Sequence, residues 1–251
     1  FEFRMCGSQD SIGEANVVLN TIVAEQFADV CDELEKAKDR DATIQKIIKD
    51  LMTRHQRIVF DGNGYSEEWR KEAARRGLAD IRSMVDAIPA LASETTVALF
   101  ERFHVFTREE LNSRVEIEYD QYAKEINIEA KTMVDVASKS IVPAVIRYST
   151  RLADSINQVS SACPEADTSV QSTILKNTSK LLAKTQKALR ALEKAVADAD
   201  QQRGSEKRAQ YFHKTVMARM DALRQPVDEL EMIVDKDLWP MPSYGDLIFE
   251  V

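Results

Sequence analysis

The sequence predicts a mainly α-helical protein whose largest feature is a long antiparallel helical bundle. Three observations indicate this fold. No glycine occurs between Gly77 and Gly204, although sheets joined by tight turns need glycine at turn positions. Apolar residues in 107–159 recur at steps of three or four, the period of one helix face. In 175–196, leucine or valine recurs every seven residues, as in a seam between packed helices.

Composition excludes several classes of partner. The 251 residues carry a formal net charge of −8, which would repel a nucleic acid or an anionic membrane. No apolar run is long enough to span a bilayer. The three cysteines are odd in number and have no CxxC spacing, which predicts a reduced, cytoplasmic setting. They are Cys6, Cys31 and Cys163.

The chain opens with "FEFR", the period-2 pattern of a strand, which places Glu2 and Arg4 on one face. A polar loop then leads into a helix predicted at about 16–34, followed by a second at about 41–55. The first helix is expected to bury Val18, Ile22, Val23, Phe27 and Val30. The second would use Ile44, Ile47, Ile48 and Leu51 as its apolar face.

The segment "RIVFDGNGYSEEW" predicts an extended piece at 58–60, a turn at 61–64 and a helix capped by Ser66. Its glycine spacing matches neither GxGxxG nor a P-loop, which favours a structural turn over a phosphate-binding loop.

A very long helix is predicted from Thr107 to about Val159. Thr107 and Glu110 form a capping box at its start, and Pro143 is expected to kink or split it. At 1.5 Å per residue the helix would be about 75 Å long.

Two further long helices complete the predicted bundle. The first starts at a capping box of Thr168 and Gln171, and the segment "DADQQRGSE" then turns the chain. A returning helix over 212–234 is expected to bend near Pro226. The seam of the first helix is expected at Leu175, Leu182, Leu189 and Val196, with Thr178, Thr185, Leu192 and Ala199 between them. Its lysines favour a solvated face over a basic binding stripe: Lys176, Lys180, Lys184, Lys187 and Lys194.

Few residues suggest chemistry. His55, His104 and His213 are far apart and fit no metal-binding motif. Glu2 and Arg4 are the one promising pair, because a carboxylate binds hard divalent cations and a guanidinium holds phosphate by two bonds. A surface ion pair is the alternative interpretation of these two residues. Tyr119 and Tyr122 are interpreted as core residues and not as a ligand platform.

An ordered set of segments resembles the C-terminal part of type III glutamine synthetases. The set is "FEFR", "VVLNTIVAEQ", "RIVFDGNGYSEEW", "ALFERFHVFTREEL", "INIEAKTMVDVASKSIVPAVIRYS" and "LWPMPSYGDLIF". The segments extend from Phe1 to the end of the chain and occur in the family's order. The sequence departs from other glutamine synthetase classes at Cys6 and Val17, where those classes typically have proline.

The resemblance implies a fragment of an ATP-dependent ligase that joins glutamate and ammonia through a γ-glutamyl phosphate, with Mg²⁺ or Mn²⁺ as metal. It implies that Glu2 is a metal ligand and that Arg4 contacts the transferring phosphoryl group or the substrate. Residues 1–106 would be the end of the catalytic domain, 107–235 an extended helical bundle with a structural or regulatory role, and 236–251 a tail returning to the catalytic domain.

The parent would be a homo-oligomer, a dodecamer of two stacked hexameric rings, and the isolated fragment is expected to be inactive. A non-catalytic helical scaffold, in which Glu2 and Arg4 are incidental, is the alternative.

Overall fold

The computed structural model describes residues 11–249, and every regular element within that range is helical. The prediction of a mainly α fold with long helices is therefore confirmed. The predicted strand at Phe1–Arg4 lies outside the described residues. The chain divides into two compact units, which meet in sequence between Val115 and Glu116.

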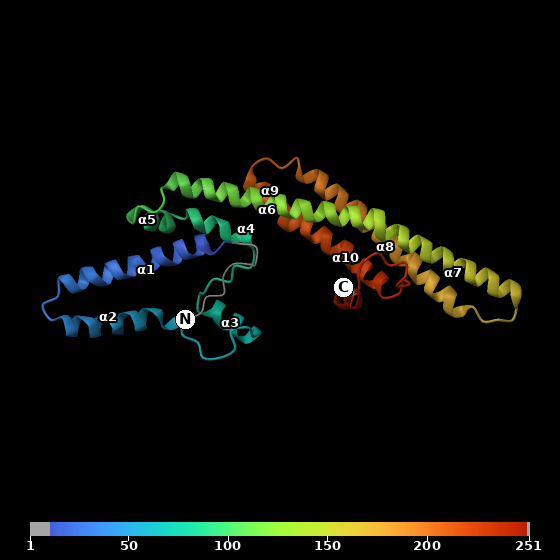
Figure 1. Cartoon of the computed structure of the whole chain (residues 1–251). Coiled ribbons are helices and arrows are strands. Elements are labelled where there is room, and N and C mark those ends of the chain that lie inside the picture. The colour runs from blue at the N-terminus through green and yellow to red at the C-terminus, as the bar shows by residue number, and fades with distance from the viewer. Residues whose placement is uncertain (1–10, 250–251) are drawn as a thin grey trace. The chain divides into compact units, whose positions relative to one another are not determined.

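The first unit consists of short and medium helices (Figure 1). They are α1 (Ile12–Glu35), α2 (Arg40–His55), α3 (Glu67–Arg75), α4 (Met84–Ala87) and α5 (Glu94–Arg102), with 3₁₀ turns at Gln56–Ile58 and Ile88–Ala92. Helix α1 packs against both α2 and α5. A small core forms where α5 meets α1 and the beginning of α6, around Phe100 and Leu111.

Helix α1 differs from its prediction in two ways. It begins at Ile12 instead of Asn16, because the Ser11 hydroxyl accepts a hydrogen bond from the Gly13 N–H at 3.1 Å and caps the helix. The expectation that Ile22, Val23 and Phe27 are buried is wrong, since all three are exposed.

The loop after α2 contains a turn two residues later than the predicted 61–64, with the Ser66 N–H donating to the Asn63 carbonyl at 3.2 Å. The Asn63 side chain accepts a hydrogen bond from the Tyr65 N–H at 3.0 Å, and Ser66 caps α3 by accepting from the Trp69 N–H at 3.2 Å. A Cβ at Gly62 would lie 2.6 Å from the Phe60 ring, so a larger residue here would displace that ring from its stack on Trp69. The extended piece expected at 58–60 is wrong in part: Ile58 ends a 3₁₀ turn, and the backbone is extended at Val59.

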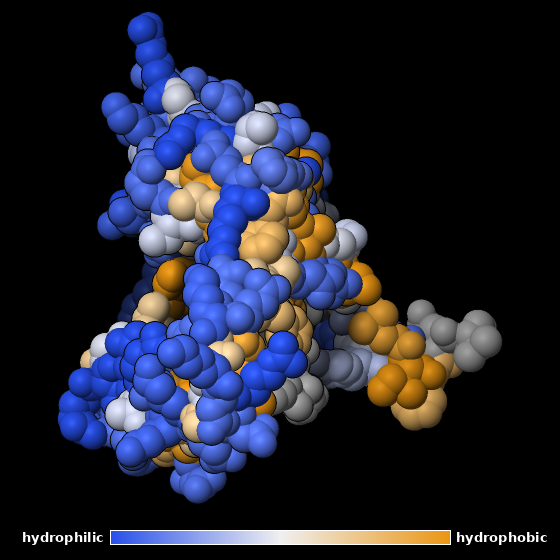
Figure 2. All heavy atoms as spheres, turned by 90° about the vertical axis from the view of Figure 1, so that its left-hand side faces the viewer, coloured by the Kyte–Doolittle hydropathy of each residue, from blue (hydrophilic) through white to orange (hydrophobic). Residues whose placement is uncertain are grey.

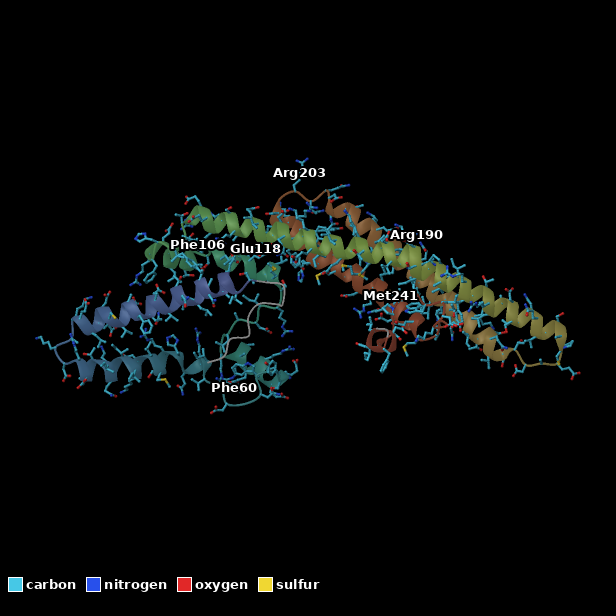
Figure 3. The ribbon with its side chains drawn as sticks, viewed as in Figure 1. Phe60, Phe106, Glu118, Arg190, Arg203 and Met241 are labelled. Atoms are coloured by element: carbon cyan, nitrogen blue, oxygen red, sulfur yellow. The ribbon has the colours of Figure 1, made fainter. Side chains whose placement is uncertain are left out.

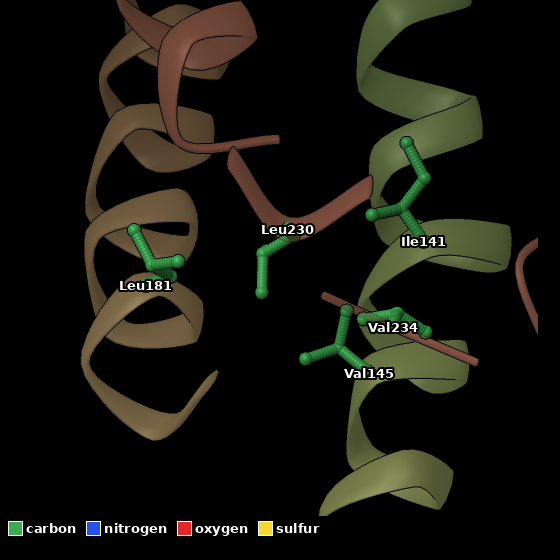
Figure 4. Close-up of a cluster of buried hydrophobic side chains, with 5 residues drawn as sticks. All are labelled: Ile141, Val145, Leu181, Leu230 and Val234. Atoms are coloured by element: carbon green, nitrogen blue, oxygen red, sulfur yellow. The ribbon is translucent and has the colours of Figure 1, made fainter. Parts of the chain in front are cut away.

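The second unit contains the long helices (Figure 1). Its elements are most of α6 (Arg108–Val136), a π-helical turn η3 (Ala137–Ile141), α7 (Val142–Ala162), α8 (Ser169–Ala199), α9 (Ser205–Tyr211), a π-helical turn η4 (Phe212–Val216), α10 (Met217–Glu231) and α11 (Tyr244–Phe249). Helix α8 packs against α7 and α10. Figure 4 shows side chains from these helices converging in one buried cluster. Its members are Ile141, Val145, Leu181, Leu230 and Val234.

The long helix starts and breaks as predicted. The Thr107–Glu110 capping box is present, with the Thr107 N–H donating to the Glu110 carboxylate at 2.8 Å and the Glu110 N–H donating to the Thr107 hydroxyl at 3.3 Å. The helix is interrupted at η3, and Pro143 lies in the first turn of α7. Proline has no N–H and crowds the carbonyl one turn earlier, and a wider π turn accommodates both effects.

The start of α8 departs from the predicted capping box. Thr168 is the N-cap residue, but its side chain makes no capping bond. The Asp167 carboxylate instead accepts from the Ser169 N–H at 2.8 Å, and this bond lowers the pKa of Asp167.

The buried seam of α8 is also displaced from its prediction. Leu189 and Val196 are buried, but Leu175 and Leu182 are only half-buried. The most deeply enclosed row is the intermediate one, which consists of Thr178, Thr185, Leu192 and Ala199. Because α8 packs between α7 and α10, the stripe between its two contact lines is covered from both sides.

The returning helix begins earlier than predicted, at Ser205, directly after Gly204 with its positive φ of 90°. It continues through η4 into α10, which keeps Pro226 buried inside it. Tyr119 and Tyr122 are buried, which confirms their interpretation as core residues. The five lysines of α8 are exposed, as predicted.

Candidate functional site

The two residues with predicted chemical roles, Glu2 and Arg4, lie outside the described residues, so their roles stay predictions. Within residues 11–249, no group of three or more His, Cys, Asp or Glu side chains is arranged to hold a metal ion. Cys31 and Cys163 are free and exposed. None of the helices in the described range has the length and apolar character needed to cross a bilayer.

His213 takes part in a contact between helices. Its Nδ1 lies 3.1 Å from the Tyr122 hydroxyl, which also contacts the Met217 sulfur at 3.1 Å. This contact joins α6 to the π-helical turn η4. Tyr122 is buried, His213 is half-buried and Met217 is partly exposed, so the contact connects helices at the edge of the packed bundle.

Helices α1 and α2 carry many exposed apolar side chains. We use the name α1–α2 apolar surface for the exposed apolar side chains of these two helices, which are Ile22, Val23, Phe27, Ile44, Ile48 and Met52. The exposed fraction of Phe27 is 67% and that of Met52 is 62%. Helix α2 has no buried residue at all. Figure 2, viewed from the left-hand side of Figure 1, where α1 ends and α2 begins, shows hydrophobic residues at the surface between hydrophilic ones.

Ion pairs hold α1 in position. Arg102 of α5 donates to the Asp29 carboxylate at 3.0 Å and to Glu25 at 3.4 Å. Both acids lie on α1. The apolar residues are thus presented on a helix that is fixed to its neighbour.

An aromatic and basic cluster supports the turn at 63–66. The rings of Phe60 and Trp69 stack with centroids 4.0 Å apart, and Arg76 lies 5.6 Å above Trp69 (Figure 3 shows Phe60). Arg76 also donates to the Val59 carbonyl at 2.7 Å. Hydrogen bonds from Arg75 and then Arg76 lower the pKa of the Glu72 carboxyl to about 2. The cluster fixes the loop between α2 and α3.

The last helix, α11, presents a second apolar surface. The Asp246 carboxylate accepts from the Ser243 N–H at 2.6 Å and from Lys236 at 2.9 Å, and these bonds lower its pKa to about 2. They fix the start of the helix. Its exposed apolar side chains are Tyr244, Leu247, Ile248 and Phe249.

A cavity of about 310 Å³ lies in the first unit, between the start of α1, the turn before α5 and the start of α6. Phe100 and Leu111 form its buried wall, and Phe106 lines it as well (Figure 3). At its edge the Arg114 guanidinium pairs with the Glu14 carboxylate at 2.5 Å. Arg114 also lies 4.3 Å above the Phe106 ring. Val17, Val18 and Leu91 complete the apolar lining.

Sequence reasoning missed the cavity and the α1–α2 apolar surface. The sequence signal for the surface was the apolar excess of α1, which was interpreted as core. No local signal indicates the cavity, because Glu14 and Arg114 are 100 positions apart.

Comparison with known proteins identifies relatives over nearly the whole chain. The sequence model of one protein family, the glutamine synthetase C-terminal domain, matches residues 43–160. A type-3 glutamine synthetase of Dictyostelium discoideum is 34% identical over 99% of this chain and 35% of the relative. A glutamine synthetase of Bacteroides fragilis (strain YCH46) is 30% identical over 99% of this chain and 35% of the relative. One of Butyrivibrio fibrisolvens is 33% identical over 83% of this chain and 30% of the relative. The chain thus spans about a third of the length of these curated relatives.

Proposed function

Because the chain belongs to the glutamine synthetase family, we propose that it is the C-terminal part of a type III enzyme that joins glutamate and ammonia at the expense of ATP. The observation that carries the proposal is the similarity to glutamine synthetases over 99% of the chain, together with coverage of only 35% of those relatives. The chain's share in the reaction would be one active-site strand, followed by helices for assembly.

In this proposal Glu2 is a ligand of Mg²⁺ or Mn²⁺, and Arg4 contacts the transferring phosphoryl group or the substrate. The residues between 11 and 249 do not fit a metal centre, since no three metal-binding side chains gather there. The other metal ligands and the ATP site would therefore come from the part of the enzyme that this chain does not cover.

The exposed apolar surfaces support an assembly role. Apolar side chains as exposed as Phe27 and Ile48 on one surface are typical of an interface. We propose that residues 1–106 belong to the catalytic domain, that 107–235 form a structural or regulatory bundle, and that 236–251 return to the catalytic domain. The complete enzyme would be a dodecamer of two stacked hexameric rings in the cytoplasm.

A γ-glutamyl transferase assay on the isolated chain and on the complete polypeptide tests the fragment proposal. The isolated chain should give a helical circular dichroism spectrum and no turnover, whereas the complete polypeptide should be active with Mg²⁺ or Mn²⁺. Turnover by the purified isolated chain would contradict the proposal.

The Arg4→Lys variant of the complete polypeptide tests the site. Lysine keeps the charge but loses the planar fork that holds a phosphate by two bonds. Turnover should fall by about 100-fold or more, as for the loss of a donor that acts in the transition state. Helix content and assembly should be unchanged. Wild-type turnover in Arg4→Lys would favour the scaffold alternative.

A further inference from the structure

The cavity in the first unit combines an apolar interior with two opposite charges at its edge. Phe100 and Leu111 in its wall are almost completely buried, with exposed fractions of 1% each. Glu14 and Arg114, by contrast, are in contact with solvent. A volume of about 310 Å³ falls at the lower end of the range of small-molecule pockets, roughly 300–1,000 Å³. The cavity is therefore large enough for one small ligand.

The charges restrict the chemistry of that ligand. A carboxylate can pair with Arg114, and an ammonium group can pair with Glu14. A molecule that carries both groups on one carbon atom, next to an apolar side chain, matches all three features. We propose that this cavity binds a hydrophobic α-amino acid, whose side chain enters the apolar interior and whose ammonium and carboxylate groups pair with Glu14 and Arg114.

The geometry supports an exchange of ion pairs. Arg114 is held by its contact with the Phe106 ring, at 4.3 Å, so it stays at the edge when its present partner moves. Glu14 lies in the first turn of α1 and faces Arg114 across the edge of the cavity. The ligand would separate the two side chains and pair with each, so the number of ion pairs rises without an unpaired charge. Burial of the ligand's apolar side chain then provides the affinity.

Isothermal titration calorimetry with four probes tests the proposal. This binding measurement does not depend on the proposed ligase activity. L-phenylalanine should bind, and L-alanine should bind about ten- to a hundredfold more weakly, because it leaves the interior empty. Phenethylamine lacks the carboxylate and 3-phenylpropionate lacks the ammonium group. Each should bind about threefold to tenfold more weakly than L-phenylalanine, since each loses one solvent-exposed, charge-assisted contact.

Three variants locate the site. Arg114→Met should weaken L-phenylalanine binding about threefold to tenfold and leave phenethylamine binding at least as tight, because only L-phenylalanine has a carboxylate and the variant frees Glu14 for the ammonium group. Val18→Phe should fill the cavity and abolish binding, while circular dichroism shows the helix content retained. Arg108→Met is the matched control, because Arg108 lies on the same helix, pairs with Glu94 and does not line the cavity.

Three results would overturn the proposal. They are no heat of binding with L-phenylalanine at millimolar concentration, unchanged binding in a folded Val18→Phe variant, and an equal loss of phenethylamine and L-phenylalanine binding in Arg114→Met.

Discussion

Two threonines on α8 have the same burial and opposite hydrogen-bonding states. Thr178 and Thr185 are both completely buried. The Thr185 hydroxyl donates to the Leu181 carbonyl at 3.0 Å, whereas the Thr178 hydroxyl has no partner among residues 11–249. A buried hydroxyl without a partner is costly, because it has lost its hydrogen bonds to water.

Thr178→Val should therefore raise the free energy of unfolding by about 1 kcal/mol, since a methyl group replaces the unpaired hydroxyl. Thr185→Val should lower it by about 0.5–1 kcal/mol, since it removes a made bond. Urea unfolding followed by circular dichroism measures both changes. A loss of stability in Thr178→Val similar to that in Thr185→Val would show that the Thr178 hydroxyl is hydrogen-bonded.

The lowered pKa of Glu72 predicts that part of the protein's stability is lost in acid. That pKa is lowered to about 2 by Arg75 and Arg76, whereas an unfolded glutamate titrates at about 4.3. A lowered folded-state pKa stabilises the folded state above the unfolded pKa. This contribution is lost as the pH falls from about 4.3 toward 2.

The difference in unfolding free energy between wild type and Glu72→Gln should shrink as the pH falls through this window. Glu193→Gln makes the same carboxylate-to-amide change at an exposed position of α8 and is the control for the substitution itself. An NMR titration of the Glu72 carboxyl gives its pKa directly, and a value near 4.3 would contradict the prediction.

At the scale of the element, the displaced seam of α8 changes which leucine contributes most to the free energy of unfolding. Leu189 is 2% exposed, whereas Leu182 is half-buried at the side of the cluster around Leu181. Leu189→Ala should lower the free energy of unfolding by about 2–5 kcal/mol, because it leaves a cavity in the packed interior. Leu182→Ala should lower the free energy of unfolding by about 1–2 kcal/mol, because the half-buried Leu182 side chain has less buried area to lose. Thermal and urea unfolding measure both changes. An equal loss of unfolding free energy in the two variants would favour the heptad predicted from the sequence over the displaced seam.

At the scale of the whole molecule, a polar substitution on the α1–α2 apolar surface should reduce association in two contexts. In the isolated chain, Ile48→Asp should reduce self-association measured by light scattering, because it interrupts an exposed apolar surface. In the complete polypeptide it should lower the amount of assembled enzyme, because this surface is part of the proposed assembly interface.

Lys46→Asp is the matched control for this experiment. It introduces the same residue at an exposed polar position of α2 and makes a larger change in charge. It should leave assembly of the complete polypeptide near the wild-type level. A wild-type yield of assembled enzyme with Ile48→Asp would remove the α1–α2 apolar surface from the proposed interface.

Much of the fold could be predicted from local sequence. The Thr107–Glu110 capping box, the Ser66 cap and the interruption before Pro143 are all present, and the turn predicted at 61–64 is found at 63–66. Each depends on groups a few residues apart, so the sequence contains the whole interaction. The spacing of apolar residues determined the helices in the same way.

Only the tertiary structure decided which apolar side chains are buried. Phe27 and Leu182 fit the helical period as well as Leu189 does, but their burial depends on whether another helix covers that side. The cavity with Glu14 and Arg114 depends on a contact between residues 100 positions apart. Periodicity specifies the face of a helix, whereas burial and sites depend on what packs against that face, and this is decided by the arrangement of distant segments.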